Sequence, residues 1–325
     1  MAIESVLSAS ANWNPAEIVL VDSASTDETV EIARKYSINI LKLKQTTFLS
    51  AGAGRFIGML YTHGDLIMYM DGDMTMSPGW LDQAIPYLMS HTELAGITGK
   101  RHDVFIESGQ IIAEADVFTE ESAVEVKHFG GAALYRRAAL EKVGGFNPYL
   151  ISEEEPELCM RLRRAGYKLV RIPYPVCTNY TLPIGSWRYF LHRFRTNLWL
   201  GHGQVVRYHL QTGMLWMVVR ERGTFVFFLA IVLMAISSFL WALLAGRNAF
   251  IVWLATVGAA FLIYWVKKRS LWAVAMSIIH QCCVAYGGVR GFMISPQSVS
   301  AYPTDVETVQ VQIPKSYAMK AVSED

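Results

Sequence analysis

The sequence has few cysteines, and none is spaced as a zinc site or a disulfide framework requires. The four are Cys159, Cys177, Cys282 and Cys283, with no Cys-x-x-Cys pair and with the last two adjacent in an apolar segment. We therefore expect neither a structural zinc ion nor a set of disulfides, and this cysteine usage favours a reducing compartment.

A signal peptide and an excess of charge are lacking as well. Residues 1–15 have no basic start and no continuous apolar core, so we expect no signal peptide there. The formal net charge is +1 and 18% of the residues are charged, which gives no indication of a nucleic acid as partner. Hydrophobic residues make up 52% of the chain and become dense after about residue 224.

The dense apolar region predicts membrane helices. Residues 224–245 contain 22 uncharged residues in a row and residues 249–266 contain 18, each enough to span a bilayer. Residues 271–293 are a weaker candidate because they carry His280, Arg290 and three glycines. We expect a membrane region over 224–293 with two to three helices. A soluble hairpin of two buried helices is the alternative.

Basic residues flank these segments unevenly. Arg220 and Arg222 precede the first segment and Lys267–Arg269 follow the second, whereas the turn between them holds only Arg247. The positive-inside rule then places residues 1–223 in the cytoplasm, with the chain integral to the cell (inner) membrane.

Strand-like and helix-like segments alternate in the first half of the chain. Apolar runs at 17–22, 38–44 and 65–71 are typical of buried strands, and helices are expected at 78–92, 136–143 and 156–166. This order predicts an α/β fold with a mainly parallel sheet and helices on both of its faces.

Two groups of acidic residues are the candidate site. Asp71 and Asp73 follow a predicted strand, and Gly72 between them allows a close turn. Ligands bind at the carboxyl ends of such strands, and two carboxylates there suit Mg²⁺ or Mn²⁺, although Asp-Gly-Asp is also an ordinary turn sequence.

The second group, Glu153–Glu155, directly precedes Pro156. We expect Pro156 to begin a helix and to hold Glu155 extended at the helix mouth as a general base. Alternatively, these acids only stabilise the helix N-terminus.

The ordered segments "VDSASTDET", "AGAGR", "GDLIMYMDGDM" and "GGAALYRRAALEKVGGFNPYLISEEEPELCMRLRRAGY" resemble family 2 glycosyltransferases with a GT-A (Rossmann-like) fold. The resemblance covers about residues 2–180. It implies a hexosyltransferase-type enzyme that inverts the sugar as it moves from a nucleotide-diphosphate sugar donor to a membrane-associated glycan or a polyprenyl- or lipid-linked acceptor.

The resemblance also implies roles for individual residues. The nucleotide is expected to contact Asp22, Arg55 and Asp71, although Phe56 stands where an asparagine is usual. Asp73 is expected to hold the metal ion, Mg²⁺ or Mn²⁺. The general base falls on Glu155, with Glu154 as the second choice, and small side chains at Gly130 and Gly131 leave room for the acceptor sugar.

Two other functions remain open at this point. One is a catalytically silent sugar-nucleotide-binding scaffold in a polysaccharide assembly complex, which intact Asp71, Asp73 and Glu155 disfavour. The other is a component of a transporter, for which two or three membrane helices are too few alone.

The expected domain organisation has four parts. A GT-A domain occupies residues 1–185, an interfacial amphipathic region 186–223, the membrane region 224–293 and a polar tail 294–325. Relatives begin with a buried central strand, whereas Ile3 is already in a predicted helix. We expect the strand at 17–22 to have an unpaired edge and the natural protein to start upstream of Met1.

Overall fold

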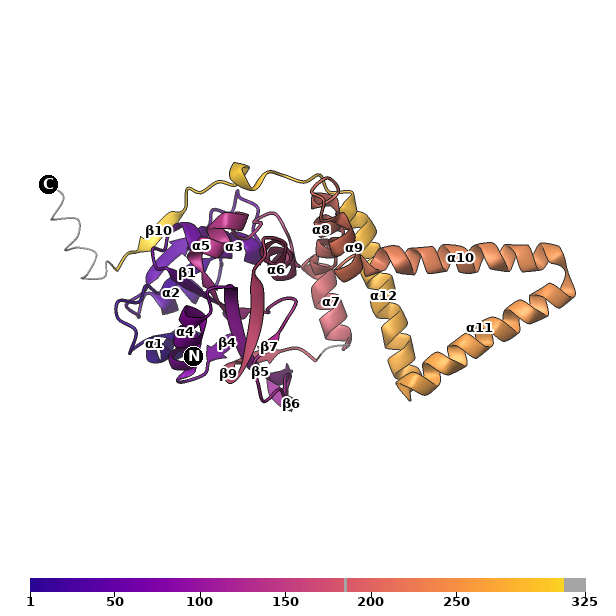
Figure 1. The fold of residues 1–325 in the computed structure, drawn as a ribbon, viewed down its shortest axis with the longest axis horizontal. Helices are drawn as coiled ribbons and strands as arrows, with labels where there is room; N and C mark the ends of the chain where they lie inside the picture. The colour runs from indigo at the N-terminus through magenta and orange to yellow at the C-terminus, as the bar shows by residue number, and fades with distance from the viewer. Residues whose placement is uncertain (184–185, 313–325) are drawn as a thin grey trace. The chain divides into compact units, whose positions relative to one another are not determined.

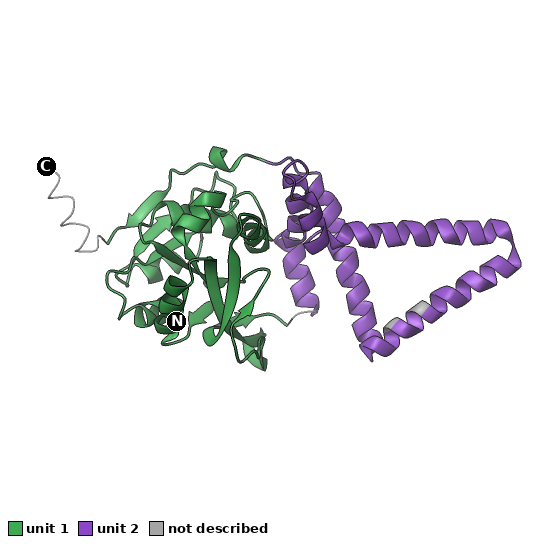
Figure 2. Cartoon of the chain, viewed as in Figure 1, with its two compact units in different colours: residues 1–183, 297–325 green, residues 184–296 purple. Residues whose placement is uncertain are grey.

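The computed structural model describes residues 1–183 and 186–312. The chain forms two compact units (Figures 1 and 2): Met1–Pro183 joins Gln297–Asp325 in the first, and Ile184–Pro296 forms the second. The second unit is an insertion between two parts of the first, so the C-terminal segment returns to the fold that the N-terminal half begins.

The strands of the first unit form two sheets. One has the order β1 (Val19–Asp22), β2 (Asn39–Lys42), β10 (Glu307–Gln310). The other has the order β3 (Leu66–Met70), β8 (Ala132–Arg136), β5 (Leu94–Glu107), β9 (Lys168–Thr181), β4 (Met74–Met76), with β6 (Gln110–Asp116) on β5 and β7 (Val124–Glu125) on β9. β1 and β3 each end a sheet, and within residues 1–183 and 186–312 no strand pairs with their outer edges.

The pairing is mixed rather than mainly parallel. β1–β2 and β5–β9 are parallel, whereas the β3–β8, β5–β8, β4–β9 and β5–β6 pairs are antiparallel. The apolar runs predicted the strands correctly but not their direction, because a strand that is buried on both faces has the same composition in either orientation.

Helices cover both faces of the larger sheet, as expected. The helices of the first unit are α1 (Ala2–Ala9), α2 (Thr29–Ala33), α3 (Ala51–Leu60), α4 (Trp80–Ser90), α5 (Arg137–Val143) and α6 (Glu154–Arg164), of which α2 packs on β1 and β2 of the smaller sheet. Along β8, Leu134 packs in a core with Leu88 of α4, while the next residue, Tyr135, lies beside Cys159 of α6. Successive side chains of a strand point to opposite faces, so α4 and α6 lie on opposite sides of the sheet.

Part of the predicted polar tail is a structural element. β10 pairs antiparallel with β2, and Val309 packs against the core around Ile38 and Ile40. Upstream, the buried Tyr302 donates a hydrogen bond to the Phe48 carbonyl at 2.8 Å. The polar composition hid this role because an edge strand needs only one apolar face. Residues 313–325 of the predicted tail lie outside the described residues.

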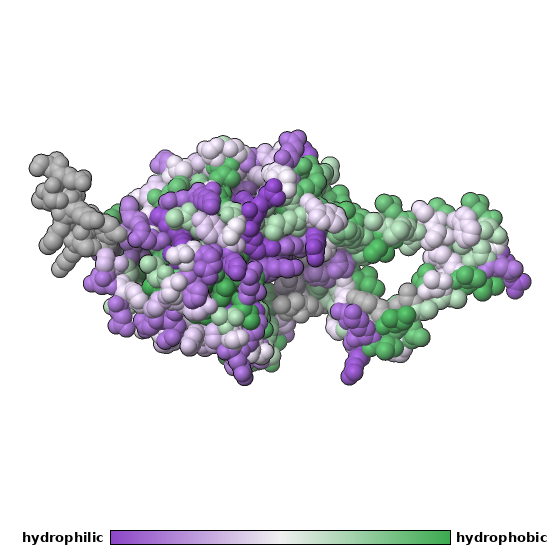
Figure 3. Space-filling view, in the orientation of Figure 1, coloured by the Kyte–Doolittle hydropathy of each residue, from purple (hydrophilic) through white to green (hydrophobic). Residues whose placement is uncertain are grey.

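The second unit is helical. Its elements are α7 (Trp187–Arg195), the short η1 (Leu198–Leu200), α8 (Gly201–Tyr208), α9 (Leu215–Glu221), α10 (Thr224–Ala245), α11 (Arg247–Lys268) and α12 (Leu271–Phe292). The last three are long and apolar enough to cross a membrane, and the apolar side chains of α10 and α11 lie on the surface (Figure 3). α12 differs because Gly287 and Gly291 let it pack closely against η1 and α8.

Candidate active site

Arg55 of α3 lies between three carboxylates from two other parts of the fold. Its Nη1 donates to Glu154 Oε1 at 2.5 Å, and its Nη2 donates to Asp71 Oδ1 at 2.6 Å and to Glu155 Oε1 at 2.8 Å. The Arg55 side chain is only 10% exposed. Four of the residues predicted from the sequence therefore meet in one partly buried ion-pair network.

Local backbone geometry brings these residues together. Asp71 directly follows β3, so it lies at the carboxyl end of that strand, and Glu154 and Glu155 occupy the first turn of α6. α3 approaches this turn closely because residue 52 is glycine: a Cβ at Gly52 would lie 2.6 Å from the Asn147 carbonyl oxygen and 3.3 Å from Glu154 Cβ.

The start of α6 differs from the prediction. The helix begins at Glu154, so Glu155 is helical rather than extended, and the preceding Glu153 has a left-handed backbone with φ of 69°. Pro156 disfavours a helical conformation at Glu155. However, proline in the first turn forfeits only an N–H that has no partner within the helix, so the helix can start before it.

Burial sets the protonation of the two glutamates. It raises the pKa of Glu155 to about 8; the positive charge of Arg55 opposes this shift, and the charges of Glu154 and Asp71 add to it. Burial likewise raises the pKa of Glu154 against the opposing effect of Arg55. Burial disfavours the charge of Arg55, but the carboxylates of Glu155, Asp71 and Glu154 outweigh it and raise the pKa of Arg55. With its pKa raised to about 8, Glu155 can exchange a proton in the pH range just above neutral.

The predicted acceptor glycines lie beside the acidic turn. Asp71 N donates to the Gly131 carbonyl at 2.9 Å, and a Cβ at Gly131 would stand 2.0 Å from Asp71 Oδ2. At Gly130, a Cβ would stand 3.4 Å from Arg101 Nη1. The room at Gly131 is thus already filled by Asp71 rather than left for a ligand, while Gly130 is exposed.

Asp73 adds a second carboxylate at this turn. Partial desolvation raises the pKa of Asp73, the charge of Asp71 raises it further, and Arg101 opposes the shift. In the described part of the chain, no three His, Cys, Asp or Glu side chains form a metal-binding group. Two carboxylates still suit Mg²⁺ or Mn²⁺, because such ions are commonly held by one or two carboxylates with substrate phosphates completing the coordination.

Asp22 lies at the end of β1 and is buried. Its Oδ2 accepts a hydrogen bond from Ser25 N at 2.9 Å, which shapes the loop after the strand. This loop approaches α3, since a Cβ at Gly54 would lie 3.9 Å from Ser23 Oγ.

Sequence reasoning missed several residues that complete the site. The Phe146 ring packs on Arg55, with the Cζ atom 5.4 Å from the ring centroid. Arg101, Asp103 and Asn179 form a linked polar group near Gly130. Polar residues at alternate positions inside a central strand, as at Arg101 and Asp103, are the signal that could have identified them.

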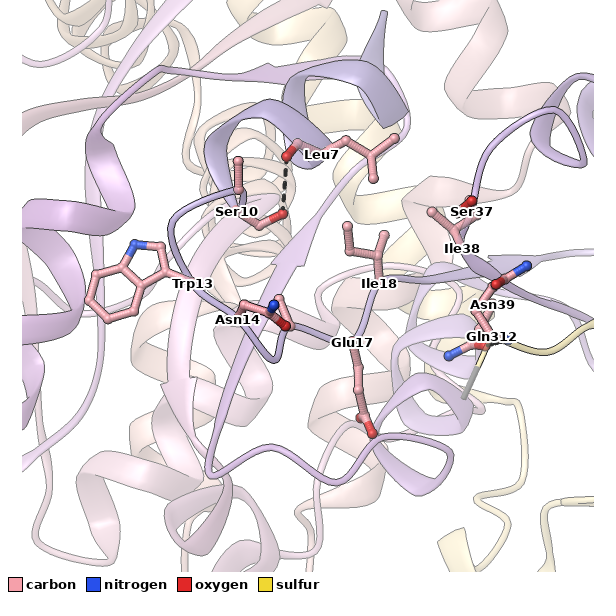
Figure 4. Close-up of a pocket in the computed structure, with 12 residues that line it drawn as sticks. Leu7, Ser10, Trp13, Asn14, Glu17, Ile18, Ser37, Ile38, Asn39 and Gln312 are labelled. Atoms are coloured by element: carbon pink, nitrogen blue, oxygen red, sulfur yellow. Dashed lines mark hydrogen bonds between the residues drawn. The ribbon is translucent and has the colours of Figure 1, made fainter. Parts of the chain in front are cut away.

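A separate pocket of about 360 Å³ lies at the opposite ends of the strands. Ile18 and Asn39, at the starts of β1 and β2, line it together with Leu7 and Trp13 (Figure 4). The acidic residues lie at the carboxyl ends of the strands, so this pocket is not part of their site.

The sequence of the chain is similar to those of known glycosyltransferases. Residues 1–144 match the model of glycosyl transferase family 2. The chain is 26% identical over 172 residues to the O-antigen chain rhamnosyltransferase WbaN of Salmonella anatum, across 48% of this chain and 53% of that protein. It is 33% identical over 179 residues to the putative glycosyltransferase EpsE of Bacillus subtilis, across 51% and 62%. These matches span roughly half to three-fifths of the relatives' lengths.

Solved structures show the same fold. The mannosyltransferase PcManGT from Pyrobaculum calidifontis, in complex with GDP-Man and Mn²⁺, matches with a TM-score of 0.56 at 17% identity, over 90% of this chain and 83% of that one. S. aureus TarS 1-349 in complex with UDP-GlcNAc matches with a TM-score of 0.50 at 17% identity, over 65% and 62%. The expected fold class is confirmed: residues 1–144 match the glycosyl transferase family 2 model, the first unit has the GT-A fold of these structures, and apolar helices that could span a membrane follow residues 1–183.

Proposed function

We propose that the protein transfers a sugar, with inversion, from a nucleotide-diphosphate sugar to a hydroxyl of a membrane-associated glycan or lipid-linked acceptor. The observation that carries the proposal is the network in which Arg55 joins Asp71, Glu154 and Glu155. The names of the similar proteins support it, since they include a rhamnosyltransferase of an O-antigen chain and structures with GDP-Man and UDP-GlcNAc.

The donor would occupy the carboxyl ends of the strands. In this proposal Asp22 contacts the base, and Asp71 and Arg55 lie near the ribose and the phosphates. Asp73 would hold Mg²⁺ or Mn²⁺, which when bound would neutralise charge on the departing diphosphate. The Mn²⁺ in the similar mannosyltransferase structure supports a divalent ion.

Glu155 would act as the general base. Its carboxylate accepts the proton of the acceptor hydroxyl while that oxygen forms a bond to the anomeric carbon. The bond between this carbon and the diphosphate oxygen breaks, and the nucleoside diphosphate leaves. Arg55 keeps part of the Glu155 population ionised at neutral pH, because its positive charge opposes the effect of burial on the Glu155 pKa.

The second unit would hold the enzyme at its acceptor. We propose that α10 and α11 span the cell (inner) membrane and that residues 1–223 are cytoplasmic. A third span by α12 would place β10 on the opposite side of the membrane from β2, with which it pairs, so we propose that α12 is an interfacial element. α7 supports an interfacial position for 186–223: basic residues occupy its last turn, while Trp187 and Leu191 are exposed.

The test is nucleoside diphosphate release by the purified chain in detergent, screened with a panel of nucleotide sugars. Glu155→Gln should lower turnover by about 10²–10⁴-fold, the usual worth of a general base, whereas Glu154→Gln should retain more activity. Asp73→Asn should remove most of the activity that added Mn²⁺ supports, while the protein still folds. A loss below about tenfold in Glu155→Gln, with a larger loss in Glu154→Gln, would transfer the role of base. Binding without turnover of any donor would favour the silent scaffold.

A further inference from the structure

Arg101 of β5 is fixed by a buried carboxylate. Its Nε and Nη2 donate to the two oxygens of Asp103 at 2.7 and 3.0 Å. Asp103 is 3% exposed and also accepts a hydrogen bond from Asn179 Nδ2 at 3.0 Å. Alternation along β5 places Arg101 and Asp103 on one face of the sheet, and the parallel partner of Asp103 on β9 is Asn179.

The remaining edge of the guanidinium faces the acidic turn. Arg101 Nη1 lies 3.4 Å from the position that a Cβ at Gly130 would take. The charge of Arg101 also acts on Asp73, where it opposes the rise of the Asp73 pKa. In the described part of the chain, Nη1 donates no hydrogen bond, and the Arg101 side chain is 28% exposed. Arg101 therefore presents a positive charge and two N–H donors on the side of the turn that carries Asp71 and Asp73.

Arg171, another arginine of the same sheet, has surroundings typical of a purely structural role and serves as a comparison. Arg171 of β9 is paired with Glu120, and the Phe118 ring covers its guanidinium at 3.5 Å. Among residues 1–183 and 186–312, no aromatic ring lies over Arg101, and Gly130 leaves the space beside its Nη1 open. A fixed, partly exposed guanidinium is the group that best matches phosphate oxygens.

We propose that Arg101 Nη1 binds a phosphate oxygen of a substrate beside this acidic turn, and that Asp103 and Asn179 are positioning residues that fix the direction of the Arg101 guanidinium. The inference rests on the proposed function, since it assigns a phosphate-bearing substrate to the same site. The phosphate belongs either to the diphosphate of the donor or to a phosphate of a lipid-linked acceptor.

Whether the phosphate belongs to the donor is tested by equilibrium binding of nucleotides to the full chain in detergent. EDTA is present so that no metal ion contributes. The probes are UDP, GDP, CDP and dTDP, each compared with its nucleoside. If the phosphate is the donor's, Arg101→Gln weakens binding of the preferred diphosphate by about 10- to 100-fold, as expected for a charge-assisted hydrogen bond. Binding of the nucleoside stays unchanged.

The acceptor is tested in the same detergent with a polyprenyl phosphate and the polyprenol of the same length. If the phosphate is the acceptor's, Arg101→Gln removes the preference for the phosphorylated lipid while diphosphate binding stays normal. Arg101→Lys should restore part of whichever preference is lost, because it keeps the charge. Asp103→Asn should weaken binding of the same probe, because it no longer holds the Arg101 guanidinium in place.

Arg171→Gln is the matched control and should change neither preference. The proposal is overturned if Arg101→Gln unfolds at the same temperature as the wild type and leaves both preferences intact. It is also overturned if Arg101→Gln and Arg171→Gln weaken the binding of all probes equally. Absence of sugar transfer by the wild type would count against the proposed function alone, since the two binding comparisons need no turnover.

Discussion

At the scale of single residues, Arg55 organises the candidate site. One guanidinium satisfies three carboxylates that would otherwise repel one another. Such a network is strongly coupled, so the state of one member changes the proton affinity of the others. The behaviour of Glu155 with pH therefore depends on the charge of Arg55.

We expect the transfer rate to rise with pH. Glu155 must be ionised to accept a proton, and its pKa is raised to about 8, so the rate should increase through neutral pH and level off above that value. Arg55→Met removes the charge that opposes the shift and should move the rising limb to higher pH. The measurement is kcat/KM from about pH 6 to 9, with Arg171→Met as control. If the rising limb of the pH profile does not move in Arg55→Met, the charge of Arg55 does not control the pKa of the general base.

Gly131 should not tolerate a side chain. A Cβ there would stand 2.0 Å from Asp71 Oδ2, so Gly131→Ala must displace the carboxylate or the strand. We expect it to lower the free energy of unfolding by about 1–3 kcal/mol. Gly130 is exposed, and a Cβ there would stand 3.4 Å from Arg101 Nη1, so Gly130→Ala should change it by about 0.5 kcal/mol or less. Urea unfolding in detergent measures both, and equal effects would contradict the close approach.

At the scale of elements, the C-terminal segment completes the first unit. β10 covers the edge of β2, and the Tyr302 ring packs against Tyr149 and Phe56 with centroids 5.4 and 6.0 Å away. This segment and the site-bearing elements belong to one unit, although the whole second unit separates them in sequence.

Tyr302→Ala should destabilise the first unit. Tyr302 is 3% exposed, and removal of a buried aromatic ring costs about 3 kcal/mol or more. Tyr302→Phe keeps the ring and loses only the hydrogen bond to the Phe48 carbonyl, which should cost about 1 kcal/mol. Thermal unfolding of the two variants separates packing from hydrogen bonding. If both match the wild type, the segment does not stabilise the unit.

At the scale of the whole molecule, a soluble-type α/β unit is joined to helices whose surfaces are apolar. Leu244 at the end of α10 is 89% exposed and Ile263 in α11 is 70% exposed. Contiguous apolar surface of this extent is rare on soluble proteins and is typical of a membrane or partner contact.

The topology can be tested with reporter fusions. A periplasmic-type reporter fused at 246–248, between α10 and α11, should be active, because the basic residues lie on the other side of both helices. The same reporter fused after Arg269 should be inactive. Reversed activities would place the first unit outside the cell membrane and contradict a cytoplasmic donor site.

The sequence by itself determined the strands at 17–22, 38–44 and 65–71, which helices are apolar along their whole length, and which acidic residues end a strand or begin a helix. These features depend on local composition and periodicity. It also predicted Arg55, Asp71, Glu154 and Glu155 as site residues through resemblance, and the structure brings these four together.

Only the tertiary structure decided the direction of the strands, the insertion of β10 beside β2 and the clustering of Arg101 with Asp103 and Asn179. It also showed that Asp71 fills the space beside Gly131. Each of these features joins residues that are distant along the chain, and the burial that raises the pKa of Glu155 comes from the same long-range packing. Local sequence patterns carry no information about such contacts, because their energy depends on groups that only the complete fold brings within reach.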